Sequence, residues 1–304
     1  MEHHHTHTHS HSVPSNANKA FITGIILNSV FVLIEAGAGL WTHSLSLLAD
    51  AGHNLSDVGS LALALFANKL AKKKASETFS FGYRQSTVLV ALLNGCILLV
   101  AMGAIAYEAI IHITTPHAIE GGFVAIIAGI GILVNAATAW MFMKDKEKDL
   151  NVKGAYLHMA SDALVSLGVV VSGVIIIYTS WFWLDSVVSL IIVVVILVSS
   201  WGLLKDSLRL TLNGVPDHIK LTEVQEYFAA LPGVTNVHDL HIWAISTTET
   251  ALTVHLVIPG STHSNEIYTE IRETLHHRFR ISHSTIQIEG NSDTFACEQK
   301  CMTN

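Results

Sequence analysis

Long apolar segments alternate with short polar loops over the first two thirds of the chain. Each segment has the roughly 20 residues that an α-helix needs to cross a hydrocarbon layer about 30 Å thick. The expected spans are residues 20–42, 45–71, 87–113, 118–143, 154–180 and 184–204. All five prolines lie outside these segments or at their edges, as uninterrupted helices require. The hydrophobic pattern therefore predicts an all-α membrane domain of six transmembrane helices.

The last third of the chain has the shorter periodicities of a water-soluble α+β domain. Two of its segments have helical periodicity and three have the β-branched pattern of strands. In chain order they are residues 221–231 (helix), 234–245 and 250–258 (strands), 264–279 (helix) and 284–289 (strand). This αββαβ order is that of a ferredoxin-like fold. The expected domains are a histidine-rich N-terminal tail (1–18), the transmembrane domain (19–209), the α+β domain (210–290) and a C-terminal tail (291–304).

The composition excludes an ordinary soluble or disordered protein. Of the 304 residues, 50% are hydrophobic and only 13% are Asp, Glu, Lys or Arg. This charged share is about half that of an average soluble domain. Residues 210–304 carry 11 acidic and 5 basic side chains, a net charge of −6, which argues against nucleic acid as a partner and is compatible with cations. The three cysteines give no disulfide framework, and no cleavable signal peptide is visible.

In the loops of the predicted membrane domain, lysine and arginine side chains lie on one side only. They follow the second, fourth and sixth spans, at Lys72, Lys73, Lys74, Arg84, Lys144, Lys146, Lys148, Lys153, Lys205 and Arg209. Because positively charged loops stay in the cytoplasm, both termini and the α+β domain are expected there. The prokaryotic character of the chain favours a bacterial inner membrane, and the lysines after the second span are expected to contact its anionic lipids.

Two predicted membrane helices carry the same motif, His-x-x-x-Asp. It comprises His53 and Asp57 in the second span and His158 and Asp162 in the fifth. An Asp at the centre of a membrane helix costs about 2.5–3.5 kcal/mol, so each pair needs an explanation. Residues i and i+4 share one helix face, and two such faces packed together bring two imidazoles and two carboxylates to one place. This set suits tetrahedral Zn²⁺, whereas the alternative is a local hydrogen bond within each helix.

Other polar residues lie near this motif or outside the membrane. Asp50 and Asn54 are placed to orient the metal ligands, although Asp50 can equally interact with the start of its helix. For Glu35 in the first span, a hydrogen bond between helices is expected in preference to metal ligation. The alternating histidines near the N-terminus suggest a metal-collecting tail or a purification tag, and Cys297 and Cys301 are weak candidate ligands.

Five segments of the chain form a specific combination. They are SLSLLADAGHNLSD (44–57), FGYRQ (81–85), NVKGAYLHMASDALVSLG (151–168), VTNVHDLHIW (234–243) and STIQIE (284–289). Together they resemble the cation diffusion facilitator family, in particular its bacterial zinc exporters. The resemblance implies a homodimer whose membrane site faces the two sides alternately and exchanges metal for protons. It also implies that the transport ligands are His53, Asp57, His158 and Asp162, with a His at the first position favouring zinc.

The resemblance further implies a metal site in the α+β domain. His238, His255 and Glu289 match positions that carry metal in some family members, and weaker candidates are His263 and His283. A zinc ion there would tighten the dimer and act as a cytoplasmic sensor. The alternative is that these histidines are solvated or packed in the core, and that the domain dimerises without metal.

These observations predict a proton-coupled zinc exporter with Zn²⁺ and H⁺ as its substrates. A free imidazole titrates near pH 6.5, so zinc binding releases protons and protonation ejects the metal. An inward proton gradient would then drive zinc efflux.

An intramembrane zinc protease would need a Glu directly after its first zinc-binding His, whereas Asn54 follows His53 and Met159 follows His158. The remaining alternative is a metal-gated channel or a metal sensor without active transport.

Overall fold

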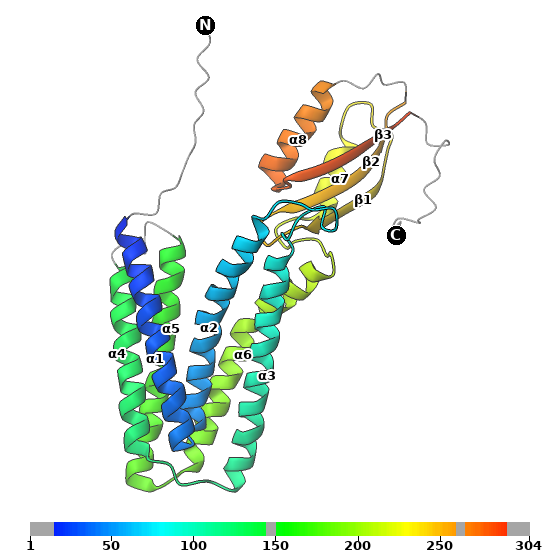
Figure 1. Ribbon diagram of the computed structural model, residues 1–304. Coiled ribbons are helices and arrows are strands. Elements are labelled where there is room, and N and C mark those ends of the chain that lie inside the picture. The colour runs from blue at the N-terminus through cyan, green and yellow to red at the C-terminus, as the bar shows by residue number, and fades with distance from the viewer. Residues whose placement is uncertain (1–14, 144–149, 260–264, 291–304) are drawn as a thin grey trace. The chain divides into compact units, whose positions relative to one another are not determined.

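Six long helices form the apolar part of the chain. The computed structural model describes residues 15–143, 150–259 and 265–290 (Figure 1). Its long helices are α1 (Ser15–Thr42), α2 (Leu45–Ala71), α3 (Ser86–Thr114), α4 (Gly121–Met143), α5 (Leu150–Thr179) and α6 (Trp183–Thr211). Five of them contain stretches apolar and long enough to cross a membrane, and α2, which carries the first motif, has sufficient length at 27 residues. The six predicted spans are therefore six helices, in the predicted order.

The chain folds into two compact units, formed by residues 1–59 with 97–199 and by residues 60–96 with 200–304. Within the first unit, α4 packs against α5 and α1 (Figure 1). A Cβ atom on Gly121 would lie 2.6 Å from the carbonyl oxygen of Gly173, and one on Gly173 would lie 2.7 Å from that of Gly121. Because only glycine permits this approach, the two positions hold α5, the second motif helix, closely against α4.

A buried carboxylate at the start of α6 binds the start of α2. Asp185, 3% exposed, accepts hydrogen bonds through Oδ2 from the amides of Leu45 and Ser46, at 2.7 and 3.3 Å. Its Oδ1 atom accepts from the hydroxyl groups of Ser44, at 2.8 Å, and Ser46. The first amides of a helix have no partners within the helix and carry partial positive charge, so a carboxylate is favourable there. Asp185 therefore fixes the beginning of α2.

The C-terminal domain, which belongs to the second unit, has a three-stranded sheet and two helices in its described part. In chain order these elements are α7 (Leu221–Ala229), β1 (Asn236–Ala244), β2 (Thr250–Val257), α8 (Asn265–Phe279) and β3 (His283–Glu289). The central strand β2 is antiparallel to β1 and parallel to β3 (Figure 1). The predicted αββαβ order is confirmed.

The two faces of this sheet have different roles. On β2, Leu252 and Leu256 are fully buried in a core that also contains Phe228 of α7 and Leu275 of α8. Because side chains alternate along a strand, His255 points to the opposite face. The helices α7 and α8 therefore cover one face of the sheet, and the histidines predicted to bind metal lie on the other.

We expect Asp185→Ala to lower the free energy of unfolding by about 2–4 kcal/mol, because it leaves buried amides at the start of α2 without acceptors. Thermal unfolding of the detergent-solubilised protein measures the change. Asp185→Asn retains one carbonyl acceptor and should lose less, and Glu108→Ala, at an exposed position of α3, should melt as the unmodified protein does. An unchanged melting temperature in Asp185→Ala would contradict this capping role.

Candidate metal centre

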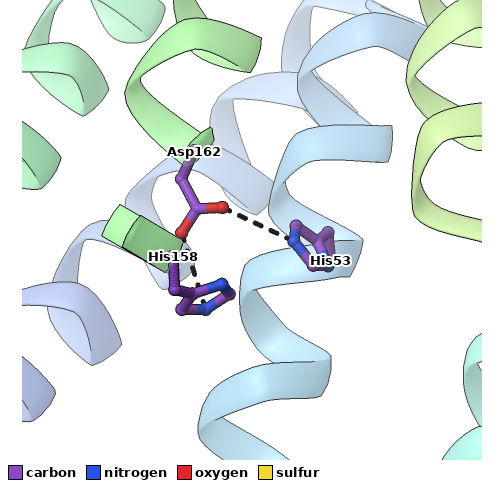
Figure 2. A group of neighbouring side chains, drawn as sticks. All are labelled: His53, His158 and Asp162. Carbon is purple, nitrogen blue, oxygen red and sulfur yellow. Dashed lines mark ion pairs between the residues drawn. The ribbon is translucent and has the colours of Figure 1, made fainter. Parts of the chain in front are cut away.

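The His–Asp motifs of α2 and α5 face each other (Figure 2). Asp162 Oδ1 lies 3.5 Å from Nε2 of His53, and Asp162 Oδ2 lies 3.6 Å from Nε2 of His158. The centroids of the two imidazole rings are 5.8 Å apart, and the rings are nearly perpendicular. The carboxylate of one helix thus contacts imidazoles from both helices, as the spacing of the motifs predicts.

Asp57 brings a second carboxylate to the same place. Its Oδ2 atom lies 3.2 Å from Nε2 of His158 and 3.6 Å from Nε2 of His53. Ligand atoms at the corners of a tetrahedron around a zinc ion, with bonds of 2.0–2.1 Å, are about 3.3 Å apart. These nitrogen–oxygen separations suit a small ion, and ligand atoms of His53, His158 and Asp162 all lie within 4.8 Å of one another, a group that does not include Asp57. We call His53, Asp57, His158 and Asp162 the membrane cluster.

The membrane cluster is buried on one side and open on the other. The side chains of Asp162 and His53 are 3% and 15% exposed, whereas those of Asp57 and His158 are 38% and 39% exposed. The open side of the membrane cluster is therefore suited to an ion that enters and leaves.

A second group of polar side chains lies beside the membrane cluster. Asn54 donates hydrogen bonds to Oδ1 of Asp50 and Oε2 of Glu35, at 3.3 and 3.5 Å, and Ser166 donates to Oδ2 of Asp50 at 2.8 Å. Glu35 thus makes the expected hydrogen bond between helices. Asp50 and Asn54 bond to this group rather than to the zinc-binding motif that we expected them to orient. The sequence analysis missed Ser166, although it continues the four-residue spacing of the α5 motif.

A second candidate metal site lies on the face of the sheet opposite α7 and α8. His238 of β1 is paired directly with His255 of β2, and their ring centroids are 5.2 Å apart. Glu289 at the end of β3 lies 2.9 Å from Nδ1 of His255 and 3.4 Å from Nε2 of His238. One ligand atom from each of these residues lies within 4.8 Å of the other two. We call these three residues the tail cluster, whose two imidazoles and one carboxylate suit Zn²⁺.

An irregularity in β1 adds a fourth polar side chain to the tail cluster. His238 pairs with His255, but His241 pairs with Thr253, so β1 has one extra residue at this point. At this bulge Asp239 has a φ of 52°, and its Oδ2 atom lies 3.5 Å from Nε2 of His255. In a regular strand, Asp239 would point to the face that the helices cover. The sequence carries no signal for the bulge, so the sequence analysis missed Asp239.

His283, the weaker candidate that lies within the described residues, does not join these clusters. His283 begins β3, six residues before Glu289, and its ring packs edge-on against that of Phe81 with centroids 5.8 Å apart. At about 3.3 Å per residue along a strand, His283 lies about 20 Å from Glu289 and about 13 Å along the sheet from the level of His255. Outside the described residues lie His263, the N-terminal histidines, Cys297 and Cys301.

Comparison with known families accounts for both domains. Residues 21–211 match the cation efflux transmembrane domain, and residues 216–291 match the cytoplasmic domain of cation efflux proteins. The chain belongs to the cation efflux family. This cation efflux protein is therefore a multi-pass membrane transporter and not an enzyme, and its C-terminal α+β domain corresponds to the cytoplasmic domain of the family. The resemblance found in the sequence is confirmed.

Three relatives of this cation efflux protein are similar to it over most of their length. The metal cation efflux system protein CzcD of Cupriavidus metallidurans is 38% identical over 277 residues, which are 91% of this chain and 88% of that protein. The cadmium, cobalt and zinc/H⁺–K⁺ antiporter of Bacillus subtilis is 36% identical over 93% of each chain. The zinc transporter ZitB of Escherichia coli is 35% identical over 95% of this chain and 93% of that protein.

Proposed function

We propose that this transporter exports zinc from the cytoplasm in exchange for protons, through the membrane cluster. The observation that carries the proposal is the meeting of two His–Asp pairs from α2 and α5, with nitrogen–oxygen separations of 3.2–3.6 Å. The names of two relatives support the choice of substrates, since one is a zinc transporter and the other an antiporter for cadmium, cobalt and zinc.

Zinc and protons compete for the same atoms of the membrane cluster. Zinc binds neutral imidazole and ionised carboxylate, so His53 and His158 must be unprotonated when they ligate the ion. A free imidazole has a pKa of about 6.5. As the pH rises through this range, the imidazoles lose protons and the affinity for zinc rises, whereas a fall in pH expels the ion. Zinc is then bound on the less acidic cytoplasmic side and released on the more acidic far side.

The charges on the loops support an orientation with both termini in the cytoplasm of a bacterial cell. Lys72, Lys73 and Lys74 follow α2 as a run of exposed cations. Such residues favour the cytoplasmic leaflet, where anionic lipids attract them at about 1 kcal/mol per charge. The inner membrane supplies both these lipids and an inward proton gradient.

In the cytoplasmic domain, the tail cluster supports a second zinc site that senses cytoplasmic zinc and stabilises a homodimer. Glu289 is nearly fully buried, at 3% exposed, and its two oxygens face one histidine each. A buried carboxylate between two imidazoles is favourable when a cation or a proton compensates its charge. The match of residues 216–291 to the family's cytoplasmic domain supports the homodimer.

We expect zinc to accumulate in inside-out membrane vesicles when the lumen is acidified, and we expect Asp57→Ala and Asp162→Ala to abolish that accumulation. Each variant removes a carboxylate that offsets the charge of the ion in apolar surroundings. Accumulation against a zinc gradient separates an antiporter from a channel or a sensor. Asp206→Ala, which breaks a part-buried ion pair with Arg209 at the end of α6, should transport normally. Unchanged uptake in either cluster variant would contradict the proposed site.

Ligand hardness predicts the effect of His53→Asp on metal selectivity. An oxygen in place of a nitrogen favours hard ions such as Mn²⁺ relative to Zn²⁺. We expect the ratio of zinc to manganese uptake rates to fall about tenfold, which corresponds to about 1.4 kcal/mol. His117→Asp, at an exposed position in the α3–α4 loop, is the control. A ratio that stays constant in His53→Asp would show that His53 does not determine selectivity.

Removal of one imidazole should empty the tail cluster. We expect His255→Ala to lower the number of zinc ions bound by the purified full-length protein by about one per chain, because two ligands hold zinc weakly. Equilibrium dialysis at neutral pH measures the number. His283→Ala should bind as many ions as the unmodified protein, since His283 lies at the other end of β3. Equal stoichiometry in His255→Ala would mean that the tail cluster does not bind zinc.

A further inference from the structure

Beside the membrane cluster lies a group of four polar side chains that the proposed zinc site does not use. Glu35 on α1, Asp50 on α2 and Ser166 on α5 are fully buried, and Asn54 on α2 is 8% exposed. All four come from the first unit of the chain. Two carboxyl groups in such surroundings are costly unless their charge is compensated.

The donors in this group are neutral. Three carboxyl oxygens accept hydrogen bonds from the Asn54 amide or the Ser166 hydroxyl, and Oε1 of Glu35 has no hydrogen-bond partner. No lysine, arginine or histidine of the described residues forms an ion pair with Glu35 or Asp50. The pair interacts electrostatically with His53 and Asp162 of the membrane cluster.

A proton resolves the repulsion between these two carboxyl groups. Two carboxylates that share one site in apolar surroundings repel each other, so one of them retains a proton as long as no nearby positive charge offsets the repulsion. A bound metal ion fits less well, because hard cations take six or more oxygen ligands and here three of the four carboxyl oxygens already face protein donors. The pair Glu35–Asp50 is therefore built to hold a proton.

We infer that Glu35 and Asp50 form a proton-binding site, separate from the zinc ligands, which releases its proton when zinc binds to the membrane cluster. The inference rests on the proposed zinc–proton exchange. In the step, an O–H bond of the shared carboxylic acid breaks, the proton leaves to water, and a carboxylate remains. The charge that drives the step is that of the zinc ion, which enters one helical turn from Asp50.

Charge counting supports this coupling. On the less acidic cytoplasmic side, where the imidazoles have lost their protons before zinc binds, the empty membrane cluster carries two negative charges from Asp57 and Asp162. These charges oppose ionisation of the neighbouring pair, since like charges favour the protonated form. A bound Zn²⁺ cancels both charges and so removes the repulsion. Residues three apart on a helix, such as Asp50 and His53, are neighbours, so the effect acts over a short distance.

Proton release on zinc binding tests the inference. Titration calorimetry in two buffers of different ionisation enthalpy counts the protons released per zinc ion by the purified full-length protein. His255→Ala serves as the background in every variant, so that the tail cluster contributes no protons to the count. We expect the count to fall by about one proton in Glu35→Gln, with zinc still bound, whereas the matched control Glu108→Gln keeps the full count. An unchanged count in Glu35→Gln overturns the inference.

Infrared difference spectroscopy of the unmodified protein provides a test that does not depend on whether a variant folds, and variants that do fold assign the signal. Zinc addition to the unmodified protein should remove the band of a protonated carboxylic acid, and Glu35→Gln or Asp50→Asn should abolish that change. A band that persists through zinc binding overturns the inference, as does a spectrum with no such band. Failure of the unmodified protein to accumulate zinc under a proton gradient would instead overturn the proposed function, so the two failures are distinguishable.

Discussion

The cost of placing ionisable groups in apolar surroundings determines how the membrane helices are held together. Each acidic side chain buried in the first unit has a partner on another helix. Asp185 binds the amides at the start of α2, Asp162 contacts the imidazole of His53, and Asp50 accepts a hydrogen bond from Ser166. Because an unpaired carboxylate would cost several kcal/mol, these contacts select the packing in which α1, α2, α5 and α6 bring their polar positions together.

Features that depend on local periodicity were predictable from the sequence. A run of apolar residues long enough to cross the membrane has few alternatives to a helix, so the six spans were recognisable. The four-residue spacing of His53 and Asp57, repeated in His158 and Asp162, places each pair on one helix face. In the C-terminal domain, β-branched alternation located the strands, and β1 begins at Asn236, two residues after the expected start. In the membrane domain, α6 continues to Thr211, seven residues beyond the expected end of the sixth span.

Features that depend on tertiary contact or on an irregular backbone were not predictable. Asp239 reaches the tail cluster only because a bulge gives it a positive φ, and strand alternation predicts the opposite face. Ser166 and Glu35 come from helices far apart in sequence, and the sequence alone does not say that both lie next to Asn54. His283 was predicted as a weaker metal ligand from its residue type. It does not join the tail cluster, because it lies at the start of β3, whereas Glu289 lies at the end.

In the proposed exchange, the charges of the membrane cluster and of the pair Glu35–Asp50 would determine which part of the proton-motive force drives export. Two protons on His53 and His158 replace the two charges of one zinc ion, so an exchange through the membrane cluster alone moves no net charge. A third proton, carried by Glu35 and Asp50, would move one positive charge inward for each zinc ion exported. The membrane potential would then contribute about 2.3 kcal/mol per 100 mV in addition to the pH gradient. On this proposal, a buried carboxyl pair beside the zinc ligands would convert an electroneutral exchange into one that also uses the electrical gradient.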